Sequence, residues 1–331
     1  MSPLLTEAVD EFFVARMPKK HSAHTLDAYR RDIRTIGSAL GEVLGLEPDD
    51  LRVDHLEAKN LRYAFAKISN QSAATIGRTW STWNQLFTFM VAEQMTPGNP
   101  MAAIERPRIA KSRPKAITGD DSVQRLLAAA SKGRTNARNP WPERDFAVVV
   151  TLLTCGLRLS ELLDLTLSSI DGPVGDRVVG VRGKGNKERT VPLEPEVETI
   201  LAAYVESRQK RFHKSVRPED PLFVDTSGEA LRRGGLQYLI DGLYKEAGIR
   251  TRVPAGALVH ALRHTFATSL ARNGATGTEL QKLLGHESLA TTQRYVDASA
   301  REVRAAARSN DAYNALDAVT SNKVDDAGRP T

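Results

Sequence analysis

One short segment limits how this chain can fold, because it suits neither a helix nor a strand. Residues 106–115 read Arg-Pro-Arg-Ile-Ala-Lys-Ser-Arg-Pro-Lys, with two prolines, five basic residues and no acidic residue. Proline fixes φ and removes a backbone donor, so such a stretch is typical of an extended, semi-rigid linker. The segment therefore predicts two domains in the 331 residues, over 1–105 and 116–310, with a C-terminal segment and tail over 311–331.

The bulk composition excludes several classes of protein. The one cysteine, Cys155, rules out an intramolecular disulfide and a cysteine-rich zinc site. It ends an apolar run, which favours a packed side chain over a catalytic thiol. The longest apolar run, near residues 147–153, is far shorter than the ~20 residues that cross a bilayer, and no signal peptide opens the chain. We expect a cytoplasmic protein that makes no membrane contact. A net charge of +6 is by itself weak evidence for nucleic acid binding.

Apolar residues recur at helical spacing throughout the first domain. The pattern predicts one helix that begins near residue 4, a second that includes residues 26–40, a shorter third near 56–68 and a fourth over about 72–95. The fourth ends at Pro97-Gly98-Asn99-Pro100. These four helices predict a small bundle.

The second domain alternates helical patterns with one β-like section. Asp120 or Asp121 can cap a helix through residue 127, and residues 145–155 form an apolar helix. Residues 177–192 predict a β-hairpin, because glycine and asparagine at 183–187 separate valine-rich stretches. Further helices are predicted over 195–211, 231–247, 260–273, 277–284, 288–296 and 299–316. The whole chain is therefore expected to be mainly α, with a mostly helical second domain that contains a small antiparallel sheet.

Three clusters hold residues that could do chemistry. In Gly156-Leu157-Arg158-Leu159-Ser160-Glu161, the glycine permits a turn that leaves Arg158 near the start of the next helix. Arg158 and Glu161 at i and i+3 could also be an ordinary surface ion pair.

The second cluster is His260-Ala261-Leu262-Arg263-His264. His260 and Arg263 share a helix face and could converge on one anion. His264 lies at i+4 from His260, which also admits a metal pair, although no third ligand is obvious nearby. The third cluster is Leu284-Gly285-His286, and Tyr295 follows nine residues after its histidine. A lone helical tyrosine is usually a half-buried packing residue.

Taken together, these clusters resemble the tyrosine recombinase, or phage integrase, family. The family signature is an arginine in Gly-Leu-Arg-x-Ser-Glu, a lysine in a β-hairpin, a His-x-x-Arg pair, a second histidine or tryptophan, and a tyrosine about nine residues later. Its positions fall, in order, on Arg158, Lys184, His260, Arg263, His286 and Tyr295. The sections 183–189 and 284–286 look most like the Xer-type branch and simple phage integrases.

The resemblance implies a site-specific DNA recombinase. It would cleave and rejoin DNA strands through a 3′-phosphotyrosyl intermediate and a Holliday junction, without ATP, metal or another cofactor. A type IB topoisomerase-like DNA-relaxing enzyme would use similar chemistry. From another class, a DNA-binding protein without catalysis is the remaining alternative.

The residue types suit metal-free phosphodiester cleavage independently of the family. Arg158 and Arg263 can each fork onto two nonbridging oxygens. Tyr295 must lose its proton as it attacks, and His260 is the candidate base, with water as the alternative.

Three further residues complete the expected site. Lys184 could protonate the departing 5′-oxygen as general acid, and His286 would hydrogen-bond the phosphate. Glu161 would orient its neighbours from behind.

Basic and polar residues on both domains and on the linker are the predicted DNA contacts, since the family's two domains clamp the duplex. Many of them could equally be solvated surface charges. The candidates are Lys19, Lys20, Thr25, Arg30, Arg34, Ser72 and Arg78 in the first domain, Arg106, Arg108, Lys111 and Arg113 in the linker, and Arg182, Lys187, Arg189, Arg232 and Arg233 in the second domain.

The family's assembly implies further partners. We expect a homotetramer on double-stranded DNA with inverted core-type sites, with an accessory protein that sets direction as a further partner. The amphipathic stretch 301–316 would dock on a neighbouring protomer, although it could fold back on its own domain. Because the first predicted helix begins near residue 4, no separate arm-site DNA-binding domain is expected.

Overall fold

The computed structural model describes residues 2–19, 23–108, 114–135, 137–183, 187–285 and 292. The chain divides into two compact units, Met1–Ser112 and Arg113–Thr331. The division falls within the proline-containing basic segment 106–115. Each unit has its own hydrophobic core.

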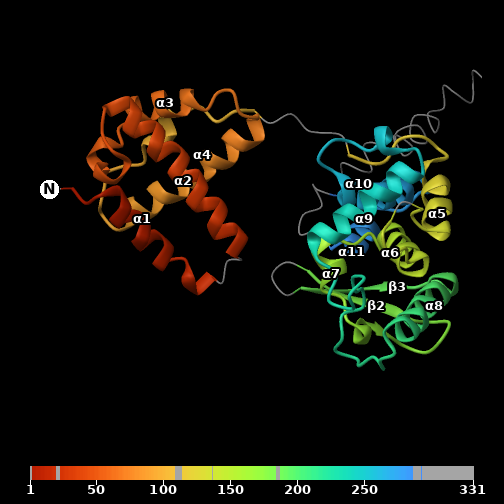
Figure 1. The fold of residues 1–331 in the computed structure, drawn as a ribbon. Helices are drawn as coiled ribbons and strands as arrows, with labels where there is room; N and C mark the ends of the chain where they lie inside the picture. Colours follow the sequence, from red (N-terminus) through yellow and green to blue (C-terminus); the bar gives the residue numbers. More distant parts are fainter. Residues whose placement is uncertain are drawn as a thin grey trace, which may run out of the picture. The chain divides into compact units, whose positions relative to one another are not determined.

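The first unit is a bundle of four helices (Figure 1). They are α1 (Leu5–Val14), α2 (Ala23–Leu44), α3 (Ala58–Lys67) and α4 (Ala73–Ala92). Short 3₁₀ turns lie at Met17–Lys19, Pro48–Asp50, Val53–His55 and Pro100–Ala103. Helix α2 packs against both α3 and α4, with apolar residues of α2 and α4 facing one another in the core. The predicted bundle is confirmed, and its helix bounds differ by a few residues at the ends.

One acidic side chain is buried inside this bundle. Asp32 on α2 accepts hydrogen bonds from the Thr79 hydroxyl at 3.1 Å, from the Thr82 hydroxyl at 2.9 Å and from the Arg78 guanidinium. Its backbone carbonyl accepts from the Trp83 indole at 3.2 Å. All four donors lie on α4, so the acid fixes the register of one helix against another.

The second unit is mostly helical and contains one small sheet (Figure 1). Its helices are α5 (Ser122–Lys132), α6 (Pro142–Cys155), α7 (Leu159–Leu163), α8 (Pro195–Phe212), α9 (Arg233–Glu246), α10 (Leu258–Arg272) and α11 (Gly277–Leu284). The strands β1 (Ile170–Asp171), β2 (Val178–Arg182) and β3 (Glu188–Pro192) run antiparallel in the order β1-β2-β3.

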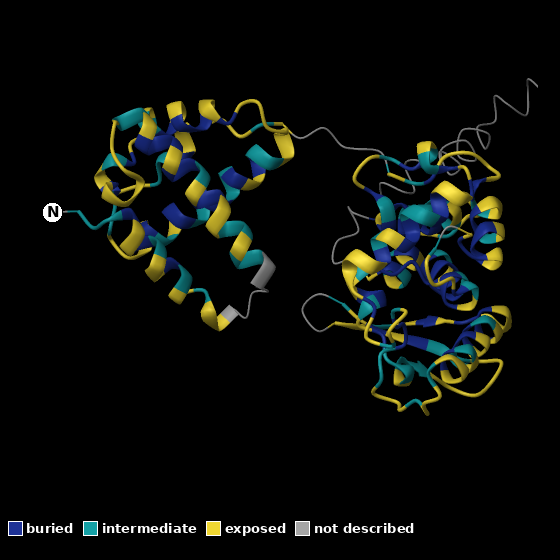
Figure 2. Cartoon of the chain, viewed as in Figure 1, coloured by how far each residue is buried: buried dark blue, intermediate teal, exposed yellow. Residues whose placement is uncertain are grey.

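Helix α6 lies at the centre of this unit, packed by α5, α8 and α10 (Figure 2). Its residues Val148, Val149, Leu152 and Cys155 are completely buried. Burial raises the pKa of the Cys155 thiol to about 11. The prediction that this cysteine is a packed core residue is confirmed.

The structure differs from the sequence predictions in detail. Strand β1 was not predicted, because two residues are too few to show a period. Asp121 precedes α5 but makes no side-chain capping bond, since its carboxylate instead accepts from Arg252. Apart from residue 292, the predicted helices over 288–296 and 299–316, including the segment predicted to dock on a neighbouring protomer, fall outside the described residues. Among the described helices, none is long and apolar enough to cross a bilayer.

Candidate active site

Gly156 sets the position of the first candidate arginine. It follows the last residue of α6 with φ of 58°, in the left-handed region that glycine adopts without strain. A Cβ at this position would lie 2.3 Å from a ring carbon of Phe266. Backbone conformation and packing therefore both require glycine, and the resulting turn places Arg158 at the N-cap of α7, as the sequence predicts.

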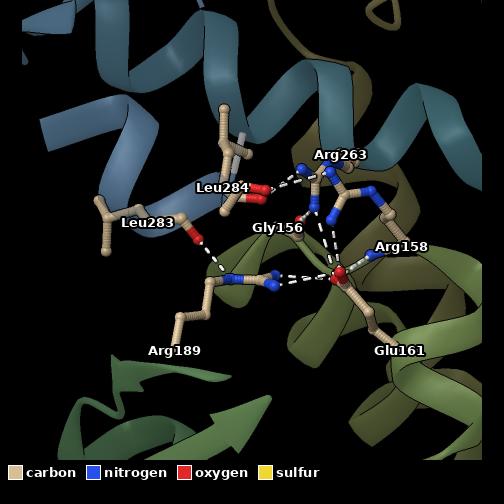
Figure 3. A network of polar contacts seen from close by, with 8 residues as sticks. Gly156, Arg158, Glu161, Arg189, Arg263, Leu283 and Leu284 are labelled. Atoms are coloured by element: carbon tan, nitrogen blue, oxygen red, sulfur yellow. Dashed lines mark hydrogen bonds and ion pairs between the residues drawn. The ribbon is translucent and has the colours of Figure 1, made fainter. Parts of the chain in front are cut away.

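Glu161 on α7 is the centre of a charged cluster (Figure 3). One carboxylate oxygen accepts from the Arg158 guanidinium at 2.5 Å, and the other accepts from the Arg158 backbone N–H at 2.8 Å. The Arg189 guanidinium donates to both oxygens, at 3.1 and 2.8 Å. The nearest Arg263 nitrogen lies 3.6 Å away. Burial alone would raise the pKa of Glu161, but these hydrogen bonds and charges lower it to about 2.

The same three arginines hold the carboxyl end of α11 (Figure 3). The last carbonyls of a helix lack partners within the helix, and the end of the helix dipole favours positive charge. Here the Leu283 carbonyl accepts from Arg189 at 2.8 Å and the Leu284 carbonyl accepts from Arg263 at 2.6 Å. The following carbonyl, of Gly285, lies 3.4 Å from Arg158. Each of three successive carbonyls therefore has its own guanidinium.

These arginines differ in their access to solvent. The Arg158 side chain is 35% exposed, whereas Arg263 is 1% exposed and also donates to the Gly156 carbonyl at 2.6 Å. The geometry joins both predicted phosphate-binding arginines to one carboxylate, with Arg158 as the one that faces outward. Glu161, which the sequence predicts to orient its neighbours, contacts Arg158 and lies 3.6 Å from Arg263.

Arg189, one of the predicted DNA contacts, lies inside the site instead of on the surface. Its side chain is only 9% exposed, and all three guanidinium nitrogens donate to internal acceptors. Strand alternation was the signal that could have found this, because Arg189 lies two residues before the buried Val191, on the same face of β3.

His260 lies on α10, one turn before Arg263, and its residue is exposed. The ring meets that of His264 edge to face, with centroids 4.4 Å apart. Although the residue as a whole is exposed, the surrounding protein partly desolvates the imidazole, and this desolvation, followed by the positive charges of Arg263, Arg158 and Lys115, lowers its pKa below 6.5. A neutral imidazole at pH 7 is suited to accept a proton.

Three predicted catalytic residues, Lys184, His286 and Tyr295, fall outside the described residues. The structure does describe the residues that lead into two of them. The Gly183 N–H donates to the Lys187 carbonyl at 2.7 Å across the hairpin, and Gly285 ends α11 with φ of 60°. Lys20, Lys111 and Arg113 also fall outside the described residues.

The other predicted DNA contacts have different surroundings in the structure. Arg78 is 47% exposed while bonded to Asp32, and Ser72 caps α4 by accepting from the Thr75 N–H. Thr25 is half-buried, and for Lys19 the structure describes the backbone alone. The remaining candidates have exposed side chains: Arg30, Arg34, Arg106, Arg108, Arg182, Lys187, Arg232 and Arg233.

Comparison with known families agrees with this architecture. Residues 117–302 match the phage integrase family, and residues 10–94 match the phage integrase N-terminal SAM-like domain. The chain belongs to the phage integrase family. It is a site-specific recombinase of the tyrosine type.

Similar proteins carry the same description. Tyrosine recombinase XerD of Listeria innocua is 31% identical over 293 residues, which cover 88% of this chain and 94% of that protein. Tyrosine recombinase XerD of Oceanobacillus iheyensis is 33% identical with the same coverage of both chains. Tyrosine recombinase XerC of Rhizobium meliloti is 33% identical and covers 84% of each.

Solved structures share the fold at lower identity. The Tn1549 transposon integrase in complex with transposon right end DNA has a TM-score of 0.67 and 18% identity, over 91% of this chain and 98% of that one. A lambda integrase tetramer bound to a Holliday junction has a TM-score of 0.66 and 18% identity, over 91% of this chain and 79% of that one. These likenesses define the fold.

Proposed function

We propose that this recombinase cleaves and rejoins DNA through Tyr295, by way of a Holliday junction and without ATP or metal. We infer that it acts in the cytoplasm, as a homotetramer on inverted core-type sites, with an accessory protein that sets direction. The observation that best supports the proposal is the arginine cluster on Glu161, with His260 beside it. Two guanidinium groups next to a neutral imidazole provide fixed positive charge and a base at one place.

The proposed reaction keeps its atoms and protons in balance. The Tyr295 oxygen attacks the scissile phosphorus and gives its proton to His260, with water as the alternative acceptor. The bond from phosphorus to the 5′-oxygen breaks, and Lys184 protonates the departing oxygen. Arg158 and Arg263, with His286, offset charge on the nonbridging oxygens.

The covalent intermediate removes any need for an external energy source. The 3′-phosphotyrosyl ester retains the energy of the broken phosphodiester, so a 5′-hydroxyl of another strand can attack it and reverse the step. Exchange of one strand pair gives the Holliday junction, and exchange of the second pair resolves it.

The test is covalent capture on nicked suicide duplexes taken from DNA that flanks the gene. We expect wild-type protein to form a denaturant-resistant complex with DNA. Tyr295→Phe should shift the same duplex in a gel and form none. The matched control is Tyr238→Phe, since Tyr238 is an exposed tyrosine of α9 in the same unit. Covalent capture by Tyr295→Phe would contradict the proposal, and relaxation of any supercoiled plasmid irrespective of sequence would favour a topoisomerase-like enzyme instead.

A further inference from the structure

Arg189 lies on the β-hairpin of the second unit and is hydrogen-bonded to two other parts of that unit, α7 and the end of α11. It is the second residue of β3, opposite Val181 of β2 in the hairpin. Its two terminal nitrogens donate to Glu161 on α7, and its Nε donates to the Leu283 carbonyl at the end of α11. One nearly buried side chain therefore links the hairpin, the arginine-bearing turn and α11.

The Arg189–Glu161 pair also lies close to the two glycines that precede predicted catalytic residues. A Cβ on Gly285 would lie 3.1 Å from the Cδ and Nη1 of Arg189. A Cβ on Gly183 would lie 3.7 Å from the Glu161 carboxylate and 4.0 Å from Arg189 Nη1. Lys184 and His286 directly follow these glycines in the sequence, so the pair lies next to the points from which both segments continue.

Charge balance gives Arg189 a second effect, on the orientation of Arg158. Glu161 now shares its two oxygens between Arg189, which forks onto both, and Arg158, whose guanidinium takes one. Without Arg189, the Glu161 oxygens would lose their bidentate partner. Arg158 is the nearest remaining guanidinium and would turn further toward the carboxylate, away from a phosphate.

We propose that Arg189 is a positioning residue for strand cleavage and makes no DNA contact. It holds Glu161 so that Arg158 faces outward, and it anchors the hairpin and the end of α11 from which Lys184 and His286 follow. This inference rests on the proposed function, because it assigns Arg189 to the step in which those groups act.

The test separates DNA binding from chemistry with two variants and one matched control. Arg189→Gln should lower single-turnover cleavage at saturating enzyme roughly 100-fold, while the DNA dissociation constant changes by less than about twofold. Arg189→Lys should recover part of the rate, because an ammonium still donates to Glu161. The control is Arg208→Gln, which also removes a nearly buried arginine that donates to backbone carbonyls, of Pro221 and Leu222. It should leave both quantities close to wild type.

A second substrate tests the link to Lys184. A duplex with sulfur in place of the 5′-bridging oxygen has a leaving group that departs without protonation. It should restore cleavage by Lys184→Ala if Lys184 is the acid. It should also raise the single-turnover cleavage rate of Arg189→Gln roughly tenfold, and so recover part of what that variant loses.

The outcomes are distinguishable from failure of the proposed function. Rescue of Lys184→Ala by sulfur without any rescue of Arg189→Gln would overturn the inference, as would a rate loss by Arg208→Gln equal to that of Arg189→Gln. A rise in the dissociation constant with normal cleavage at saturation would identify Arg189 as a DNA contact. If sulfur fails to rescue Lys184→Ala, the acid assignment fails, and Arg189 is judged by its rate loss at unchanged affinity.

Discussion

Asp32 in the first unit and Glu161 in the second are both buried acids that accept hydrogen bonds from arginine, yet the segments that they connect differ in number and in separation along the chain. The donors to the Asp32 carboxylate lie within two turns of a single helix, α4. Those to Glu161 come from α7 itself and from β3, and the Arg263 guanidinium of α10 lies nearby. The first acid aligns two neighbouring helices, whereas the second joins segments that are far apart in the sequence.

The arginine partners of the two acids also differ in how far they depend on the acid for charge compensation. Arg78 remains half exposed, so water can replace Asp32 as its partner. Arg189 and Arg263 are almost fully buried, so loss of Glu161 leaves positive charges that water cannot reach. A buried acid is therefore a local packing device in one unit and the organising centre of the candidate site in the other.

The largest expected difference between the two acids is in cleavage rate, when each is neutralised without a change in size. Glu161→Gln should lower single-turnover cleavage at saturating enzyme by roughly 1,000-fold, because the surrounding arginines lose their common anion. Asp32→Asn should leave that rate within about threefold. Equal losses of cleavage rate in the two variants would contradict the distinction.

Removing each acid should lower the free energy of unfolding of its own unit, and by a larger amount in the second unit. Glu161→Ala should cost about 3–5 kcal/mol, because it strands buried cations. Asp32→Ala should cost about 1–3 kcal/mol, since Arg78 can be hydrated and mainly the two threonine hydroxyls lose an acceptor. Urea unfolding followed by tryptophan fluorescence resolves the two, because Trp80 and Trp83 lie in the first unit and Trp141 in the second. A larger loss in Asp32→Ala would reverse the comparison.

Acid should weaken the second unit within a definite range of pH. The folded pKa of Glu161, about 2, lies below its ordinary value of 4.5, so the ionised carboxylate stabilises the fold above pH 4.5. That stabilisation is lost as the pH falls from 4.5 toward 2. Trp141 fluorescence during acid titration measures it, and the same titration of Glu161→Gln should lack this component.

The positive charges of the site should also appear in the pH dependence of cleavage. Because burial and nearby cations lower the pKa of His260, its neutral form persists below pH 6.5. The acid limb of the single-turnover rate should therefore begin below pH 6.5, with a slope of about tenfold per pH unit. An acid limb that begins above pH 6.5 would remove His260 as the base.

The smallest effect is expected where an ion pair is solvated. Arg182 and Glu188 pair at 3.3 Å across the hairpin, but both side chains are largely exposed. Glu188→Gln should therefore change the free energy of unfolding by less than about 0.5 kcal/mol. A cost comparable to that of Glu161→Ala would show that burial does not explain the difference between the pairs.

Much of this architecture could be predicted from the sequence, because it follows from periodicity and residue type. Apolar spacing located the helices, and the glycine before Arg158 predicted the turn that places it. The resemblance to the tyrosine recombinase family implied that Arg158, Glu161 and Arg263 belong to one site, and the structure brings these three together. The second reason for glycine at position 156 is seen only in the structure, where a Cβ would collide with the ring of Phe266.

What could not be predicted depends on backbone acceptors. The sequence places Arg189 among the basic residues expected on the surface, whereas its side chain is nearly buried. Its partner carbonyl at Leu283 is a group that every residue has, so no sequence pattern marks it. The burial of Arg263 between two carbonyls has the same origin.

Helix α11 has eight residues, too few to persist alone in water, and its N-terminal capping box of Thr276 and Glu279 fixes one end only. The other end depends on three guanidinium groups from α7, β3 and α10. Amide hydrogens of α11 should therefore exchange with deuterium through openings shared with those elements, as one cooperative unit. Exchange at Leu280 and Leu284 then reports on the integrity of the arginine cluster, and a single backbone measurement can follow the cluster through each step of strand exchange.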